Sequence, residues 1–436
     1  MDAKSMTPHF ALPFRGVAGS VPALLGLLLG VVMPILAAFI YPTYMHHMGN
    51  PFYEWTRLQE VPFVFAELCV VIWAMARGME LRDYVAPLPR DIKAALALFV
   101  AGLFTSSLLV SEQVLTSVVI SASMCVHVMF GVAVYHLIGR GDAHVSRALP
   151  YGLGLGLIAL TILTAWKFLA PPPASSVYGG VIEWHAALPG FISVRHFGSW
   201  TGAIAALFAG FILARKEQGK LDWRDWFFLL AIGMTIWSGT RAAILAIAVA
   251  CLIQIVGTRR FPSFHTIGRL SILTGMGAVL AWGLLPAAAP EFRLFQSASE
   301  YSSLSSAGSG RVEMWTLAFQ RWLDAPLFGW GSGSTFWEVF IGWRHTQPHN
   351  FVLQFLISWG IVGASGAFWL LGRTVWRAQR IVLRQQPALW PLMTCLYTLL
   401  GMACLEGMLH YPRFIMLIVA LMAIILKLGA ESREAA

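Results

Sequence analysis

Charged side chains are scarce in this chain. Only 12% of its 436 residues are Asp, Glu, Lys or Arg, while 58% are hydrophobic and the mean hydropathy is +0.69. A soluble protein of this size would need roughly twice that density of charge to cover its surface. The composition therefore excludes an ordinary soluble globular protein and indicates an integral membrane protein.

Cysteine is also rare, and no cysteine motif is present. The five cysteines fall inside apolar runs, and none has the spacing of a metal ligand: Cys69, Cys125, Cys251, Cys395 and Cys404. The last two share one run and would lie about 13 Å apart by helical rise, too far for a disulfide. We interpret all five as small core residues.

Apolar runs of roughly 17–25 residues recur instead from end to end, and each is long enough to cross a bilayer core of about 30 Å. No Ser-rich linker or second soluble domain interrupts them. Residues 1–436 are therefore predicted to form one all-α polytopic membrane domain, whose first helix is retained because no small-residue cleavage site follows it. Twelve transmembrane helices are expected, near residues 21–40, 61–77, 93–110, 114–138, 149–170, 197–214, 226–238, 241–257, 268–289, 351–372, 388–408 and 412–428.

Most of the 30 Lys and Arg residues lie in alternate connecting segments. By the positive-inside rule these segments are cytoplasmic, and an even number of spans then places both termini in the cytoplasm. The net charge of +9 is thus explained by topology, so no nucleic-acid partner is expected. Two larger segments face outward, over residues 171–196 and 287–350.

The second outer loop is predicted to contain an amphipathic helix over residues 311–324, lying on the membrane or on the helix bundle. A Ser/Gly-rich hinge over 302–310 precedes it, Pro326 ends it, and residues 329–334 follow as a flexible turn. Its expected apolar face comprises Val312, Trp315, Leu317, Ala318, Phe319, Trp322 and Leu323.

Four basic residues are each expected at the outward-facing start of a helix: Arg195, Arg241, Arg311 and His349. Free N–H groups and the helix dipole favour an anion at such a position, and arginine adds forked donors that suit phosphate. A cation there is unfavourable unless something negative binds. The pattern therefore predicts a ligand that bears phosphate. Asn350 is expected to cap the helix after His349, whose imidazole could take a proton from a hydroxyl at neutral pH.

Other interpretations of these residues remain open. Short flanking helices would put Arg241 inside the protein, below the outer membrane edge, where an arginine normally marks a site; alternatively it snorkels to lipid headgroups. His345 and His349 have the spacing of helical metal ligands, but Pro348 interrupts a helix through both. Glu67 is expected to pair with a polar group of a neighbouring helix, and His127 is expected in the core.

Three motifs, in this order, resemble the O-antigen ligase and polymerase superfamily: Ser238-Gly-Thr-Arg241-Ala-Ala; Gly310-Arg311-x-x-x-Trp315 with Asp324-x-Pro326-Leu-Phe-Gly329-x-Gly331-x-Gly333; and Pro348-His349-Asn350-Phe-x-Leu-Gln with Gly360-x-x-Gly363. Within the superfamily, the chain most resembles the O-antigen ligases. The resemblance implies a GT-C-like architecture in the bacterial inner membrane, with the active site facing the periplasm. It also implies a glycosyltransferase that moves a glycan from an undecaprenyl-pyrophosphate donor to the lipid A–core of lipopolysaccharide.

In this interpretation Arg241 and Arg311 bind the pyrophosphate, with Arg195, and His349 is the general base of an inverting transfer. Asn350, Arg344 and His345 are assigned to substrate binding. The outer loops contain no Asp-x-Asp pair to hold a divalent ion, so we expect no metal and no cofactor. An O-antigen polymerase, a protein O-oligosaccharyltransferase, a lipid-linked glycan transporter and an assembly scaffold remain alternatives.

Overall fold

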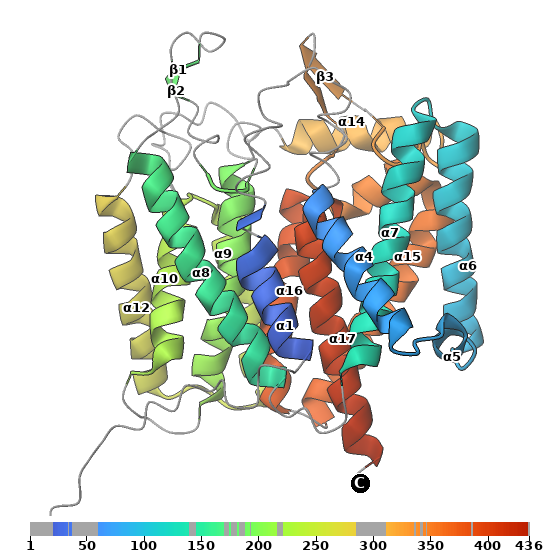
Figure 1. Ribbon diagram of the computed structural model, residues 1–436. Helices are drawn as coiled ribbons and strands as arrows, with labels where there is room; N and C mark the ends of the chain where they lie inside the picture. The colour runs from blue at the N-terminus through green and yellow to red at the C-terminus, as the bar shows by residue number, and fades with distance from the viewer. Residues whose placement is uncertain are drawn as a thin grey trace, which may run out of the picture.

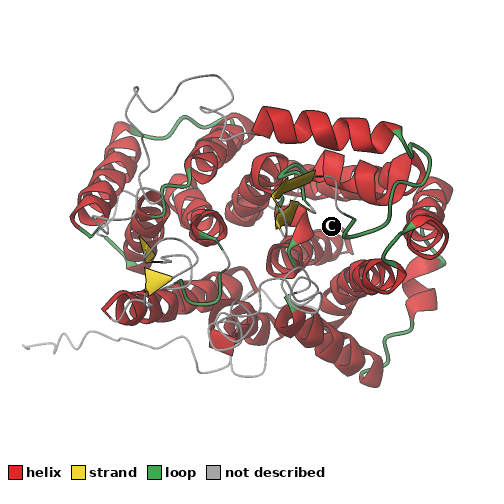
Figure 2. Cartoon of the chain, turned by 90° about the horizontal axis from the view of Figure 1, so that it is seen from above, coloured by secondary structure: helices red, strands yellow, loops and turns green. Residues whose placement is uncertain are grey.

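The computed structural model describes residues 21–33, 35–36, 60–138, 145–169, 174–175, 181–182, 188–191, 193–215, 221–284, 311–334, 337–340, 343–345, 347–384 and 387–434. A helix lies in each of the twelve segments predicted to span the membrane, and these helices run roughly parallel (Figures 1 and 2). They are α1 (Val21–Leu27, continued by η1, Leu28–Val32), α4 (Val61–Ala76), α6 (Arg90–Thr105, continued by η2, Ser106–Val110), α7 (Val114–Leu137), α8 (Val145–Leu169), α9 (Val194–Ala214), α10 (Trp223–Trp237), α11 (Arg241–Thr258), α12 (Phe264–Gly283), α15 (Phe351–Arg384), α16 (Trp390–Glu406) and α17 (Pro412–Glu434).

Within the described residues, nine helices are long and apolar enough to cross a membrane. This finding confirms the predicted all-α polytopic membrane protein. The helices α1, α4 and α10 are shorter, so the total of twelve spans stays a prediction, as does the side of the membrane that each end faces. The N-terminal residues 1–20 and the Ser/Gly-rich hinge at 302–310 lie outside the described residues.

The shorter elements described next lie at one end of the bundle. The helix α14 (Arg311–Leu323) lies across this end, and the hairpin of β3 (Trp337–Phe340) and β4 (Trp343–His345) stands above it (Figure 1). A second hairpin, β1 (Ala174–Ser175) with β2 (Val181–Ile182), stands at the same end above α8. We call this end the α14 end. The short helix α5 (Leu81–Val85) lies at the opposite end, where the chain also terminates.

The core is centred on α9, α16 and α17, whose side chains are the most completely buried. Close approach of backbones holds the periphery to this core. A Cβ at Gly30 would lie 2.1 Å from the Gly152 carbonyl oxygen, and one at Gly102 would lie 2.2 Å from the Cα of Gly363. Glycine therefore permits the α1–α8 and α6–α15 contacts, as small residues do between transmembrane helices in general.

The helix α15 is broken at Gly360, which has φ 60° and ψ −169°. The break releases backbone groups, and the segment after α14 bonds to them. Trp330 N–H donates to the Ile357 carbonyl at 2.7 Å, and Ile361 N–H donates to the Pro326 carbonyl at 2.8 Å. The predicted turn at 329–334 is present, and the positive φ of its glycines lets its backbone pack against this break.

A helix lies at residues 311–323, within the range predicted for the amphipathic helix, and only part of its apolar face is buried against the described residues. Met314 and Ala318 are buried, whereas Val312, Phe319 and Leu323 are 59%, 45% and 53% exposed. The helix is rotated because its polar first residue, Arg311, turns inward to a carboxylate. Apolar periodicity cannot foresee a rotation that an ion pair sets.

Two further expectations are corrected. The cysteines are not all core residues, since Cys69 and Cys404 are exposed on outward helix faces while Cys395 is buried. Arg241 is exposed rather than enclosed in the protein. The argument for its enclosure assumed a short preceding helix, but Asp222 caps α10 and begins it three residues earlier than expected.

Candidate active site

The segment Gln347–Asn350 is held firmly at the start of α15. The Asn350 side chain accepts hydrogen bonds from Val352 N–H at 2.9 Å and Leu353 N–H at 3.2 Å, so it caps the helix as predicted. Its amide nitrogen also donates to the Cys404 carbonyl in α16 at 3.2 Å. From the other side, the Trp315 indole of α14 donates to the Pro348 carbonyl at 2.8 Å.

His349 lies between these anchors in a left-handed conformation, with φ 52°. A non-glycine residue pays roughly 1–2 kcal/mol for that conformation. The anchors on both sides enforce it. Residues held in such a backbone conformation by their neighbours are often found at functional sites, where the orientation of the side chain matters.

Glu406, the last residue of α16, lies opposite His349. It is 3% exposed, and one carboxylate oxygen accepts a hydrogen bond from the Arg311 guanidinium. The other oxygen is 4.0 Å from Nδ1 of His349. Gly407 ends the helix at φ 65°, and a Cβ there would lie 2.4 Å from Oε1 of Gln347. The end of α16 is thus closely packed against the histidine segment.

Arg195 and Arg241 come from two neighbouring helix starts. Ser193 caps α9, and the Arg195 guanidinium donates to the carbonyl of Gly239, in the turn just before Arg241. Gly198 lets that turn approach, since a Cβ there would lie 2.0 Å from the Ser238 hydroxyl. Both arginines lie close enough to Glu406 to interact with its carboxylate electrostatically.

The structure therefore brings the four predicted basic residues together around one acidic residue. Arg195, Arg241 and Arg311 arrive from three different helices, and His349 from the start of a fourth. The carboxylate of Glu406 offsets one of the three arginine charges, so positive charge remains in excess. A small anion with two or more negative charges suits that excess.

Residues 226–368 of the chain match the family model of the O-antigen ligases. The match covers 143 of the 436 residues, and it shows what this segment is similar to. It contains Arg241, Arg311 and His349, whereas Arg195 and Glu406 lie outside it. A search of curated proteins found no match. This similarity, together with the apolar helices, supports a membrane enzyme of glycosyl transfer, of ligase or polymerase type in general.

Not every predicted site residue can be placed within the O-antigen ligase segment. Arg344 and His345 belong to β4, in which Arg344 pairs with Glu338 and His345 with Trp337, but their side chains lie outside the described part. Among the described residues, no group of three or more His, Cys, Asp or Glu residues could hold a metal ion.

Glu406 is the site residue that sequence reasoning missed. A signal for it exists, because a carboxylate at the C-terminal end of an apolar helix is disfavoured by the helix dipole and by desolvation. Such a residue needs a cation, and the sequence places none beside it. The cation comes from Arg311, 95 residues earlier.

A second buried ion pair at the α14 end of the bundle was also missed. Arg413 Nε donates to the Glu60 carboxylate at 2.9 Å, and its backbone N–H donates to the same group at 2.9 Å. The guanidinium also lies 4.0 Å from the centroid of the Phe191 ring. This pair joins the starts of α4 and α17 with the segment before α9, so it is a structural support.

Glu67 and His127 form a pair inside the bundle, with Oε2 2.5 Å from Nδ1. The predicted partner for Glu67 and the core position of His127 are both confirmed, since each residue is buried.

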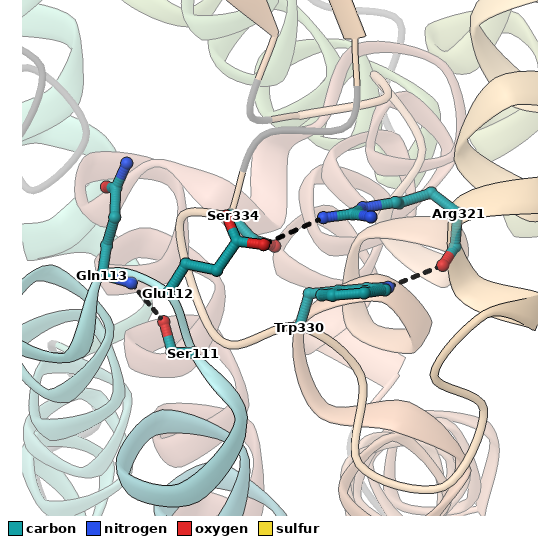
Figure 3. Close-up of a pocket in the computed structure, with 6 residues that line it drawn as sticks. All are labelled: Ser111, Glu112, Gln113, Arg321, Trp330 and Ser334. Atoms are coloured by element: carbon teal, nitrogen blue, oxygen red, sulfur yellow. Dashed lines mark hydrogen bonds and ion pairs between the residues drawn. The ribbon is translucent and has the colours of Figure 1, made fainter.

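A small notch of about 10 Å³ lies beside α14, lined by Ser111, Glu112, Gln113, Arg321, Trp330 and Ser334 (Figure 3). The Arg321 guanidinium lies over the Trp330 ring at 3.4 Å and is 3.7 Å from the Glu112 carboxylate. The Trp330 indole in turn donates to the Arg321 carbonyl at 2.7 Å. These contacts hold the end of α14 against the turn between η2 and α7.

Proposed function

We propose that the chain is an O-antigen ligase that transfers a glycan from an undecaprenyl-pyrophosphate donor to the lipid A–core of lipopolysaccharide at the periplasmic face. The observation that carries the proposal is the cluster of Arg195, Arg241, Arg311 and His349 at one end of the bundle. A diphosphate is the kind of anion that an excess of guanidinium groups binds. An imidazole beside it is suited to deprotonating a sugar hydroxyl.

In the proposed reaction, the acceptor hydroxyl attacks the anomeric carbon from the face opposite the diphosphate. A new C–O bond forms, the bond from the anomeric carbon to the diphosphate oxygen breaks with its electron pair, and the hydroxyl proton moves to His349. The configuration at the anomeric carbon inverts. The arginines stabilise the negative charge that develops on the leaving diphosphate, which is the role of preorganised donors in a transition state.

We propose that the transfer needs no metal cofactor, because arginine side chains are available to stabilise the leaving diphosphate. The outer loops hold no Asp-x-Asp pair, and guanidinium groups supply the positive charge that a divalent ion would otherwise supply. Asn350 orients the histidine segment through its cap and its bond to α16.

The test is reconstitution of the full chain in lipid vesicles with undecaprenyl-pyrophosphate-linked glycan and purified lipid A–core. Mass analysis should detect glycan joined to lipid A–core, at a rate unaffected by EDTA. Parallel reactions replace lipid A–core with a growing glycan chain or an acceptor protein. Product in either of those reactions, and none with lipid A–core, would reassign the enzyme to polymerisation or protein glycosylation.

A further inference from the structure

The carboxylate of Glu406 is placed for a definite task within the site. It is buried at the C-terminal end of α16, where the helix carbonyls repel a negative charge and water cannot solvate it. Such a position is tolerated only because Arg311 binds one oxygen. The second oxygen lies 4.0 Å from Nδ1 of His349, which is an ion-pair distance, so a small approach of the two side chains would bring them to hydrogen-bond distance.

Three hydrogen bonds and one backbone conformation hold the two residues in this relation. Asn350 ties the histidine segment to the carbonyl of Cys404, two residues before Glu406. Gln347 donates to the hydroxyl of Tyr411, beyond the end of α16. Trp315 fixes the Pro348 carbonyl, and the left-handed backbone of His349 aims its side chain. The carboxylate is therefore preorganised beside the imidazole.

We propose that Glu406 is the positioning residue of His349. Its free oxygen accepts the Nδ1 proton, which selects the tautomer whose Nε2 lone pair is available to the acceptor hydroxyl. The carboxylate then stabilises the imidazolium that forms when His349 takes the acceptor proton. This is how a carboxylate supports a catalytic histidine in general. The inference rests on the proposed transfer reaction and names a residue outside the segment matched to the family.

The surrounding charges give the carboxylate a second effect. The groups that face this site are Arg311 of α14, Arg195 of α9, Arg241 of α11 and Glu406 of α16. Three guanidinium groups disfavour a further positive charge on His349, and among the described residues the carboxylate of Glu406 opposes them. The negative charge of Glu406 therefore favours protonation of the His349 imidazole, although three arginines lie in the same cluster.

The test is Glu406→Gln, which keeps the shape of the side chain and removes its charge, compared with Glu313→Gln as a matched control. Glu313 is exposed on α14. In the reconstituted reaction, Glu406→Gln should lower kcat by about 10- to 10³-fold, which is less than the loss of the base itself. The acid limb of the kcat/KM profile should move to lower pH, because an imidazole without a neighbouring carboxylate loses its proton more readily. Glu313→Gln should change neither quantity.

A double-mutant cycle separates positioning from a structural role. If Glu406 acts through the histidine, the double variant His349→Asn/Glu406→Gln should be no slower than His349→Asn alone. Glu406→Asp, which retains the charge, should recover part of kcat and leave the acid limb near its wild-type position. It also serves as the test variant if Glu406→Gln fails to fold, since full loss of kcat in a folded Glu406→Asp would overturn the proposal.

Two results would contradict the inference, and they differ from failure of the proposed function. Multiplicative losses in the cycle, or an unmoved acid limb in Glu406→Gln, would show that Glu406 does not act through His349. Full activity of His349→Asn would instead show that the histidine is not the base, whatever the variants of Glu406 do.

Discussion

The two ends of the helix bundle both carry charged clusters, but their charges are balanced differently. At the start of α10, Asp222 and Asp225 form a capping box, and Arg215 pairs with both. Arg269 adds a contact to Asp225 at 3.6 Å. Two carboxylates thus meet two guanidinium groups. At the α14 end, three arginines and a histidine surround the single carboxylate of Glu406.

The number of carboxylates relative to guanidinium groups distinguishes a cluster that stabilises the fold from one that binds an anion. Charges that only hold helices together are expected to be matched, because a buried unmatched charge is costly. An excess of one sign has a use only when a ligand of the other sign arrives. The predictions below test whether the α14 end binds and reacts while the α10 start only stabilises.

The largest effect is expected from His349→Asn. Asparagine tolerates the left-handed backbone and so preserves the loop, but it cannot act as a base. Transfer should fall by about 10²- to 10⁴-fold in kcat, with little change in thermal stability. Product formation in vesicles and a thermal unfolding scan measure the two quantities. Near-normal transfer by the folded variant would remove the general-base role.

At the opposite end, Asp225→Asn should reduce stability instead of chemistry. Asp225 is fully buried and faces Arg215 and Arg269, so neutralising it leaves buried charge unmatched. A loss of about 3–5 kcal/mol in the free energy of unfolding is expected. The variant should keep its activity per folded molecule. A specific fall in kcat, with unchanged stability, would break the contrast between the two ends.

Arg311→Lys sharpens the contrast within the α14 end. Lysine retains the charge beside Glu406 but lacks the fork that binds two phosphate oxygens. Transfer should fall by about 10- to 10²-fold, with the folded fraction preserved. Kinetics at varied donor concentration, with size-exclusion chromatography as the folding control, test this expectation. A variant as active as the parent would argue against a diphosphate clamp.

Asn350→Ala should produce the smallest change of the set. It removes a helix cap worth about 1 kcal/mol and the bond to the Cys404 carbonyl. The melting temperature should drop by a few degrees, and transfer should fall less than in His349→Asn. Asn350→Asp retains the cap but has no donor for the Cys404 carbonyl, so comparison with Asn350→Ala separates the two contributions. If stability were unchanged in Asn350→Ala, the cap would contribute less than its geometry indicates.

Much of the architecture follows from local sequence. The twelve helical segments, the helix after the Ser/Gly-rich stretch and the cap at Asn350 are all readable from apolar length, periodicity and a cap residue before a helix. The break at Gly360 was not foreseen. Its cause is distant, because the segment from Pro326 to Gly331 supplies the hydrogen bonds that the broken helix lacks.

The candidate site divides in the same way. Arg195, Arg241, Arg311 and His349 could be named from the chain because each precedes or begins a helix, a property of neighbouring residues. Glu406 and the orientation of α14 could not be named, since the Arg311–Glu406 pair joins residues 95 positions apart and turns the helix about its axis. Periodicity reports which residues share a face, but long-range pairing sets where that face points.

From the chain alone follow the membrane class, the helical segments and a set of cations at helix starts, because hydropathy and helix termini are local properties of sequence. Three-dimensional packing adds that these cations converge, and that a buried carboxylate from the end of α16 stands among them. Charges interact through space and not along the chain, so only the arrangement of α9, α11, α14 and α16 could bring them together.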